Sequence, residues 1–221
     1  ERLLDRVDHD GGSFLRVWEP AEWFVILGRG NQADREVDLS ACGKRDIPVL
    51  RRSSGGGAVL LGPGCLCYSI ILPIESDTRL FSSKSTNEWI LERISRSLSG
   101  LSVAPIETRG DSDLTLGDRK IAGHAQRRKR NALLFHGSLL LNFDPSPMET
   151  FLRAPSRSPE YRQNRAHAGF VTNLPVPAAK VKQALKSEWL AHEDTSPGPP
   201  IGEVPVGGEA TDRTARVPSA R

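Results

Sequence analysis

The chain has 221 residues, of which 38% are hydrophobic and 26% are charged, and it carries a formal net charge of +3. This length and apolar fraction are enough for one sizeable domain with a packed core. The small net charge does not indicate a nucleic-acid partner, and no stretch reaches the ~18 apolar residues of a membrane span, so neither partner is expected.

The first twelve residues, ERLLDRVDHDGG, are polar and lack the apolar run of a secretory signal peptide. They begin with Glu1 rather than Met, as in a processed or truncated chain. Cys42, Cys65 and Cys67 form an odd set without the framework of an extracellular disulfide protein. We therefore expect reduced thiols and a cytoplasmic protein.

Apolar segments in the first third of the chain predict strands: 14–20, 23–30, 47–52, 58–61 and 65–73. A short polar turn joins the first two. Segment 35–46 predicts a helix that ends near Gly43–Lys44. A glycine-rich stretch follows the third strand, and Pro63–Gly64 form a turn between the last two.

Two later segments predict helices because apolar side chains recur at helical spacing: 82–101 and 178–192. Ser and Thr residues suit the start of the first helix, and Gly100 suits its end. Between them, residues 112–125 predict a hairpin with its turn near Gly117–Asp118, followed by a short strand, and residues 131–144 predict a strand pair. Strands interleaved with helices predict an α+β domain with packed helices on a mixed, largely antiparallel sheet.

The last part of the chain differs in composition. Residues 193–221 are rich in Pro and Gly and have too little apolar surface to fold alone. We expect one domain over residues 1–192 and a disordered tail over residues 193–221.

The stretch RRSSGGGAVLLGPG, residues 51–64, concentrates conformational freedom between two apolar segments. It lacks the Lys-Ser/Thr pair of a P-loop, and it is followed by a strand rather than by the helix of a dinucleotide fingerprint. An isolated glycine run is usually a flexible hairpin loop. Here Arg51 and Arg52 stand beside bare backbone amides, which favours binding of phosphate or carboxylate.

A second informative stretch runs from Asp111 to Asp144. Lys120 precedes a run of small residues, so its compact charge can reach a phosphoryl or acyl oxygen in a pocket. Asp113 lies upstream and is suited to a hard cation. The alternative is an ordinary hairpin with a solvated lysine.

Together, the blocks RRSSGGGAV, GDRKIAGHAQ and HGSLLLNFD resemble lipoate–protein ligase A and its relatives, over roughly residues 14 to 150 and in the same order. The resemblance implies a biotin/lipoate ligase fold, related to class II aminoacyl-tRNA synthetases, for a catalytic domain over residues 1–192. The family activates lipoate with ATP to lipoyl-adenylate, and then transfers the acyl group to a lysine of a lipoyl domain.

The resemblance also implies roles for individual residues. Lys120 matches the lysine that contacts both the acyl carbonyl and the phosphate, where its charge stabilises the transition state. Asp113 matches an acidic position near phosphate and magnesium. The residues implied to line the adenylate and acyl site are Arg52, Gly55, Gly56, Gly57, Ala58, Val59, Asp113, Gly123 and Ala125. The nucleophile is the partner's lysine, so none is needed here.

The chain departs from the family pattern at several positions. Leu61 and Gly62 replace a common His-Asp pair, and Cys65 replaces a common asparagine, which leaves those polar contacts to ligand or nucleotide open. His124 replaces a serine, either as a functional group or as a tolerated substitution. The family's C-terminal accessory domain is not recognised, so a separate small accessory protein is a further expected partner.

The implied cofactors are ATP and magnesium, with lipoate, octanoate or lipoyl-adenylate as substrate. The implied partners are acyltransferase subunits of 2-oxoacid dehydrogenases or the glycine cleavage H protein. Two alternatives stay open: a cofactor-independent octanoyl- or lipoyl-transferase that carries the acyl group on a cysteine, and a non-catalytic acyl- or nucleotide-binding protein. Cys65 and Cys67 are interpreted first as buried strand thiols.

A basic run, Gln126 to Ala132, has two interpretations. It is either a solvated hairpin tip or a docking surface that steers an acidic lipoyl domain toward Lys120.

Overall fold

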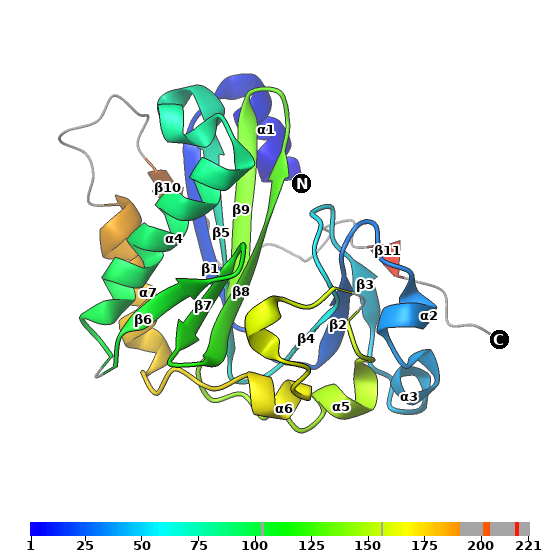
Figure 1. Cartoon of the computed structure of the whole chain (residues 1–221). Helices are drawn as coiled ribbons and strands as arrows, with labels where there is room; N and C mark the ends of the chain where they lie inside the picture. Colours follow the sequence, from blue (N-terminus) through cyan, green and yellow to red (C-terminus); the bar gives the residue numbers. More distant parts are fainter. Residues whose placement is uncertain (103, 156, 191–200, 204–214, 217–221) are drawn as a thin grey trace.

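The computed structural model describes residues 1–102, 104–155, 157–190, 201–203 and 215–216 (Figure 1). Within these residues the strands form a seven-stranded sheet in the order β10-β1-β5-β9-β8-β7-β6 and a four-stranded sheet in the order β11-β3-β2-β4. The pairs β1–β10 and β2–β3 are parallel and the other ladders are antiparallel. The predicted α+β fold with a mixed, largely antiparallel sheet is confirmed.

The strands have these bounds: β1 Ser13–Trp18, β2 Phe24–Leu27, β3 Val49–Arg51, β4 Val59–Leu61, β5 Cys65–Pro73, β6 Ile106–Arg109, β7 Asp113–Leu116, β8 Arg119–Arg128, β9 Ala132–Leu140, β10 Ile201–Glu203 and β11 Ala215–Arg216. The helices are α1 Arg2–Asp10, α2 Ala33–Glu36, α3 Leu39–Lys44, α4 Ser83–Ser99, α5 Met148–Phe151, α6 His167–Phe170 and α7 Ala178–Leu190. Short 3₁₀ turns lie at Ile74–Ser76, Thr78–Leu80 and Glu160–Arg162.

Helices α4 and α7 cover one face of the seven-stranded sheet (Figure 1). Both were predicted, and α4 begins where expected because the Ser82 side chain accepts a hydrogen bond from the Ser85 backbone N–H. Apolar side chains of the two helices and of the sheet form one buried cluster. The Arg93 guanidinium joins the helices, since its Nε donates to Glu188 Oε1 at 2.9 Å and it stacks on Trp189.

The four-stranded sheet carries a second apolar cluster, together with α3, α5 and α6. Two short helices, α2 and α3, replace the single helix predicted over 35–46. Val37 is extended and forms a β-bridge with Leu152, and the Asp38 side chain then caps α3 by accepting from the Ala41 backbone N–H. One continuous helix could not make this bridge.

The connectivity of the strands also differs from the prediction. The strands predicted over 14–20 and 23–30 exist, but β1 and β2 belong to different sheets rather than to one hairpin. The strand pair predicted over 131–144 is wrong: β9 is a single strand, paired along its length with β5 and β8. The hairpin predicted over 112–125 corresponds to β7 and β8, but no separate short strand follows it, because β8 runs without a break from Arg119 to Arg128. The strand β6 was not predicted.

Helix α1 was not predicted from its mostly charged sequence. Leu4 and Val7 are buried against Ile71 and Ala132 of the large sheet. Two residues are enough to bury one face because the helix has only nine residues.

Most of residues 193–221 lies outside the described residues, so the predicted tail and the domain boundary stay predictions. Within this stretch, β10 pairs with β1 and β11 pairs with β3, where the sequence indicated no strand. No helix in the described part of the chain is long and apolar enough to cross a bilayer.

Candidate functional site

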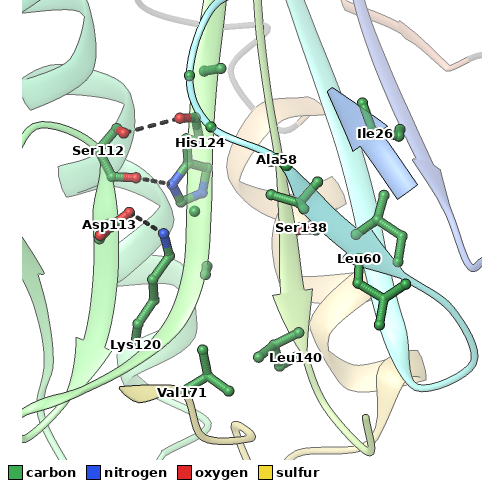
Figure 2. Close-up of a pocket in the computed structure, with 18 of the residues that line it drawn as sticks. Ile26, Ala58, Leu60, Ser112, Asp113, Lys120, His124, Ser138, Leu140 and Val171 are labelled. Atoms are coloured by element: carbon green, nitrogen blue, oxygen red, sulfur yellow. Dashed lines mark hydrogen bonds and ion pairs between the residues drawn. The ribbon is translucent and has the colours of Figure 1, made fainter. Parts of the chain in front are cut away.

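A pocket of about 500 Å³ lies where the two sheets face each other. Strand β4 and the glycine-rich stretch form one wall, and β5, β8 and β9 form another. Residues 157–171, which follow α5, supply further lining side chains. Figure 2 shows Lys120 and Asp113 on one side of the pocket and Ile26, Ala58 and Leu60 on the other.

Lys120 and Asp113 form an ion pair in this pocket, with Nζ 2.6 Å from Oδ1 (Figure 2). Asp113 begins β7 and is paired with Gly123 on β8. The lysine side chain crosses Gly123 so closely that a Cβ there would lie 2.7 Å from Nζ. A register shift at Leu114 and Thr115 accompanies this arrangement. The structure thus brings Lys120, Asp113 and Gly123 together, and position 123 needs glycine because the lysine amine occupies the space of a side chain there.

The second oxygen of Asp113 is also bonded. The Tyr161 hydroxyl donates to Oδ2 at 2.7 Å. Burial first, and then the charge of Asp113, raise the pKa of Tyr161, so the phenol stays protonated and donates. Tyr161 was not predicted as a site residue, because no sequence pattern singles out the segment that holds it.

Arg52 organises the glycine-rich stretch from the pocket side. Its Nη2 donates to the carbonyl oxygens of Gly55 at 2.7 Å and Gly57 at 2.9 Å. Burial lowers its pKa to about 10, which still leaves it charged at neutral pH. Arg51 instead binds backbone carbonyls of Gly28 and Asn31, so it fixes the neighbouring turn.

The glycines act mainly by what they make room for. Gly56 has φ of +91°, and a Cβ on Gly28 would overlap its carbonyl oxygen. Of the predicted site residues in this stretch, the ones that line the pocket are Arg52, Gly56, Gly57, Ala58 and Val59. Gly55 is not among the lining residues. Gly123 and Ala125 line the opposite wall.

Two half-buried histidines line the pocket. His124 Nδ1 lies 2.7 Å from the carbonyl oxygen of Ser112 and donates to it, while Nε2 accepts from the Tyr68 hydroxyl. Burial lowers its pKa to about 4, so the imidazole is neutral. His136 Nε2 lies 2.6 Å from Ser54 Oγ, and burial, followed by the charge of Arg52, lowers its pKa to about 3.

The departures from the family pattern have structural counterparts. Leu61 lines the pocket, and Gly62 has no room for a side chain because the Trp23 ring lies against it. Cys65 is buried beneath the pocket, and burial raises the pKa of its thiol to about 12. Cys67 does line the pocket, but burial raises its pKa even further. Cys42 is buried in α3, away from the pocket lining.

Magnesium has few protein donors here. Among the described residues, no three His, Cys, Asp or Glu side chains gather in a way that could hold a metal ion. Asp111 and Asp113 are the described carboxylates that line the pocket, and both oxygens of Asp113 already have partners. This set fits only an ion that takes its other ligands from phosphates and water, as magnesium commonly does.

The basic run lies away from the pocket. Lys129 pairs with Asp5 of α1, and Arg128 Nη1 donates to Thr86 Oγ1. The tip is nine residues beyond Lys120, about 30 Å of extended chain. In Figure 1 the β8–β9 tip stands beside α1. The run therefore forms a hairpin tip whose Arg128 and Lys129 have partners within the chain, and its role in docking an acidic domain stays a prediction.

Sequence comparison places this geometry among known proteins. Residues 1–189 match the family described as the lipoyl protein ligase A/B catalytic domain. A Schizosaccharomyces pombe protein named as a lipoate-protein ligase A is 30% identical over 172 residues, which are 78% of this chain and 46% of that protein. A Mycoplasma pneumoniae protein with the same name is 31% identical over 138 residues, 62% of this chain and 39% of that protein. The chain thus spans less than half the length of these relatives.

Other relatives differ in their named activity. The octanoyltransferase LipM of Clostridioides difficile is 30% identical over 167 residues, 66% of this chain and 59% of that enzyme. Among solved structures, a lipoate-protein ligase A bound with ATP has a TM-score of 0.72 at 25% identity, covering 92% of this chain and 81% of that one. A bipartite lipoate protein ligase from Thermoplasma acidophilum has a TM-score of 0.73 at 23% identity, covering 92% and 79%.

Proposed function

The chain belongs to the lipoyl protein ligase A/B catalytic domain family, and from this membership we propose that it activates lipoate or octanoate with ATP and transfers the acyl group to a lysine of a lipoyl domain. The observation that carries the proposal is the Lys120 ammonium, held by Asp113 over Gly123 at the wall of the pocket. A cation fixed at this place can interact with both the phosphate and the acyl carbonyl of a bound acyl-adenylate.

The lining of the pocket supports an acyl substrate. Apolar side chains from both sheets line it, among them Ile26, Leu60 and Leu140. Apolar side chains of this kind favour contact with a hydrocarbon chain, because the contact removes apolar surface from water. Lys120 and Arg52 add positive charge to the same pocket. Such a pocket binds a ligand that is apolar along its length and anionic at one end.

In the proposed first half-reaction, the substrate carboxylate attacks the α-phosphorus of ATP and pyrophosphate leaves. In the second, the partner's lysine amine attacks the acyl carbonyl, loses a proton, and AMP leaves. Negative charge develops on the phosphoryl oxygen and then on the carbonyl oxygen. Lys120 is the proposed catalytic residue because its ammonium stabilises both charges without moving far.

The proposed nucleotide contacts follow from the same wall. Gly56, Gly57 and Ala58 line the pocket and have no bulky side chains, so an adenylate can lie directly against their backbone amides. Asp113 and Asp111 are the proposed carboxylates near a magnesium ion, which neutralises phosphate charge when it arrives with ATP. Arg52 fixes the conformation of the loop by donating hydrogen bonds to the carbonyl oxygens of Gly55 and Gly57.

The alternative is an octanoyl- or lipoyl-transferase, and the relative named LipM favours keeping it. Such an enzyme needs a thiolate to carry the acyl group. The cysteine that lines the pocket is Cys67, and burial raises the pKa of its thiol so far that the thiol stays protonated. We therefore expect a variant with Cys42, Cys65 and Cys67 all changed to Ala to keep full ATP-dependent activity per folded molecule. An acyl thioester trapped on Cys67 of the unaltered chain would favour the transferase.

The proposed partners are lipoyl-domain proteins: acyltransferase subunits of 2-oxoacid dehydrogenases or the glycine cleavage H protein. The three described cysteines are unpaired and buried, which supports the proposed cytoplasmic setting. A separate accessory protein for the adenylation step is part of the proposal, and the bipartite ligase among the structural relatives supports it.

The test is to incubate the pure chain with lipoate, ATP, magnesium and a lipoyl domain, and to follow the domain's mass. We expect ATP-dependent gain of one lipoyl group. A parallel reaction supplies synthetic lipoyl-adenylate instead of lipoate and ATP. Transfer from the adenylate that clearly exceeds transfer from lipoate and ATP supports the accessory protein, and equal rates exclude it. Failure of both reactions contradicts the proposed function.

A further inference from the structure

Tyr161 lies in the 157–171 segment, in the short turn Glu160–Arg162. Its ring packs against Phe170, with ring centroids 5.2 Å apart, and against the backbone of Gly110 in the β6–β7 turn. Gly110 has φ of +58°, and a Cβ there would lie 3.6 Å from Tyr161 Cε1. The ring is therefore fixed on two sides, and its hydroxyl is aimed at Asp113.

The Asp113 carboxylate is held at both ends. Oδ1 contacts Lys120 Nζ at 2.6 Å, and Oδ2 accepts from the Tyr161 hydroxyl at 2.7 Å. The terminal torsion of an aspartate side chain is broad and only two-fold restricted. A carboxylate bonded at one oxygen can therefore swing, whereas one bonded at both oxygens keeps its plane.

The same part of the chain also fixes the backbone of Lys120. Val171 forms a parallel β-bridge with Lys120, and the Thr172 N–H donates to the Lys120 carbonyl oxygen at 2.8 Å. Arg165 ties the segment to the β7–β8 turn through the Asp118 carboxylate at 2.8 Å. The lysine is thus held at its backbone and, through Asp113, at its ammonium by one segment.

We propose that Tyr161 is a positioning residue for acyl transfer, which orients the Asp113 carboxylate and through it the Lys120 ammonium. The inference rests on the proposed function of Lys120. Tyr161 contributes a hydrogen bond to a charged group rather than a contact to the reacting atoms. Loss of its hydroxyl lets Asp113, and with it the lysine amine, leave the geometry that the reaction needs.

The direct test is Tyr161→Phe, which keeps the ring contacts and removes only the hydroxyl. We expect kcat for transfer from lipoyl-adenylate to fall about ten-fold, while KM for the lipoyl domain stays unchanged and a thermal melt shows that the variant is folded. The matched control is Glu160→Gln, an exposed neighbour in the same turn that lines no part of the pocket described above. Wild-type kcat in Tyr161→Phe would overturn the proposal.

A double-mutant cycle shows whether the effect passes through Asp113. In an Asp113→Asn background, Tyr161→Phe should change kcat by less than two-fold, because the carboxylate it orients is gone. An equal loss in both backgrounds would mean that Tyr161 acts elsewhere, which overturns the inference.

Labelling of Lys120 by acetic anhydride, followed by mass spectrometry, gives a readout independent of turnover. Tyr161→Phe should label Lys120 about three-fold faster, whereas exposed Lys84 is labelled at the same rate in both proteins. If the unaltered chain transfers no acyl group, the proposed function fails while this measurement still decides on Tyr161. Equal labelling of Lys120 contradicts the positioning role.

Discussion

The two walls of the pocket are built by opposite means. On the lysine wall, Lys120 pairs with Asp113, and Asp113 in turn accepts a hydrogen bond from Tyr161. On the glycine wall, the shape comes from side chains that are missing, since Gly28 lets the carbonyl of Gly56 approach its Cα closely. Catalysis at the lysine wall depends on the position of the Lys120 ammonium. Binding at the glycine wall depends on the path of the backbone in the glycine-rich stretch. Substitutions on the two walls should therefore fail in different ways.

Lys120→Ala should give the largest effect of the substitutions on the two walls. We expect acyl transfer to fall at least about 10³-fold, because the cation at the developing charge is lost. The fold should survive, since the side chain is about a quarter exposed and packs no core. Transfer rates and a thermal melt check this. Near-normal turnover in a folded variant would remove Lys120 from the proposed mechanism.

Gly123→Ala tests the same wall without replacing a charged residue. The added Cβ would stand 2.7 Å from Lys120 Nζ and must push the amine aside. We expect about 10²-fold lower kcat with little change in stability, as for a misplaced catalytic group. Gly100→Ala, at the C-terminal end of α4, is the control for an added methyl group, since its φ is −68° and a Cβ there meets nothing. Equal activity of Gly123→Ala and the wild type would show that the amine position is unimportant.

Gly28→Ala probes the glycine wall. Its Cβ would overlap backbone, which cannot yield as a side chain does, so we expect a loss of about 2 kcal/mol in the free energy of unfolding. Binding of lipoyl-adenylate should weaken as the loop shifts. Urea unfolding and a binding titration measure the two effects. The comparison between the walls breaks if this variant is as stable as Gly30→Ala, where a Cβ meets nothing.

The smallest expected effect concerns the contact between the walls, His136 to Ser54. Burial holds the pKa of His136 at about 3, below the ordinary value of 6.5, so the unfolded chain takes up a proton first as the pH falls. Stabilisation is complete above about pH 6.5 and is lost below it. At pH 5.5 the loss should be about 1 kcal/mol from this group. The drop between pH 7 and 5.5 should be smaller in His136→Asn, and an identical drop would exclude His136 as its source.

The sequence predicted the parts whose signals are local. Apolar runs marked β3, β5 and the region of β9, and helical spacing marked α4 and α7. The family resemblance of short continuous blocks singled out Lys120, Gly56 and Gly57, and the structure places all three at one pocket. The block that holds Lys120 pairs through the register of β7, β8 and β9, whereas the glycine block lies between β3 and β4 of the other sheet.

The missed features depend on distant partners. Whether β1 and β2 share a sheet is decided by competition among strands far along the chain, and their sequences do not record it. Tyr161 became a site residue only because its segment returns to Asp113, 48 positions earlier. Arg52 was predicted to face a ligand, but its donors also bind carbonyls of its own loop, and only the loop's folded path reveals this.

Helix α1 precedes every other described element in the sequence, yet it depends on chain made much later. Lys129, which pairs with Asp5, is 124 residues away in the sequence, and Asn131 bonds to Asp8 across a similar separation. A nine-residue helix is marginal by itself in water. The segment therefore cannot become structured until the β8–β9 hairpin exists, and loop-closure entropy opposes the contact until then. During synthesis on the ribosome, α1 therefore waits for its native contacts until more than a hundred further residues have been made.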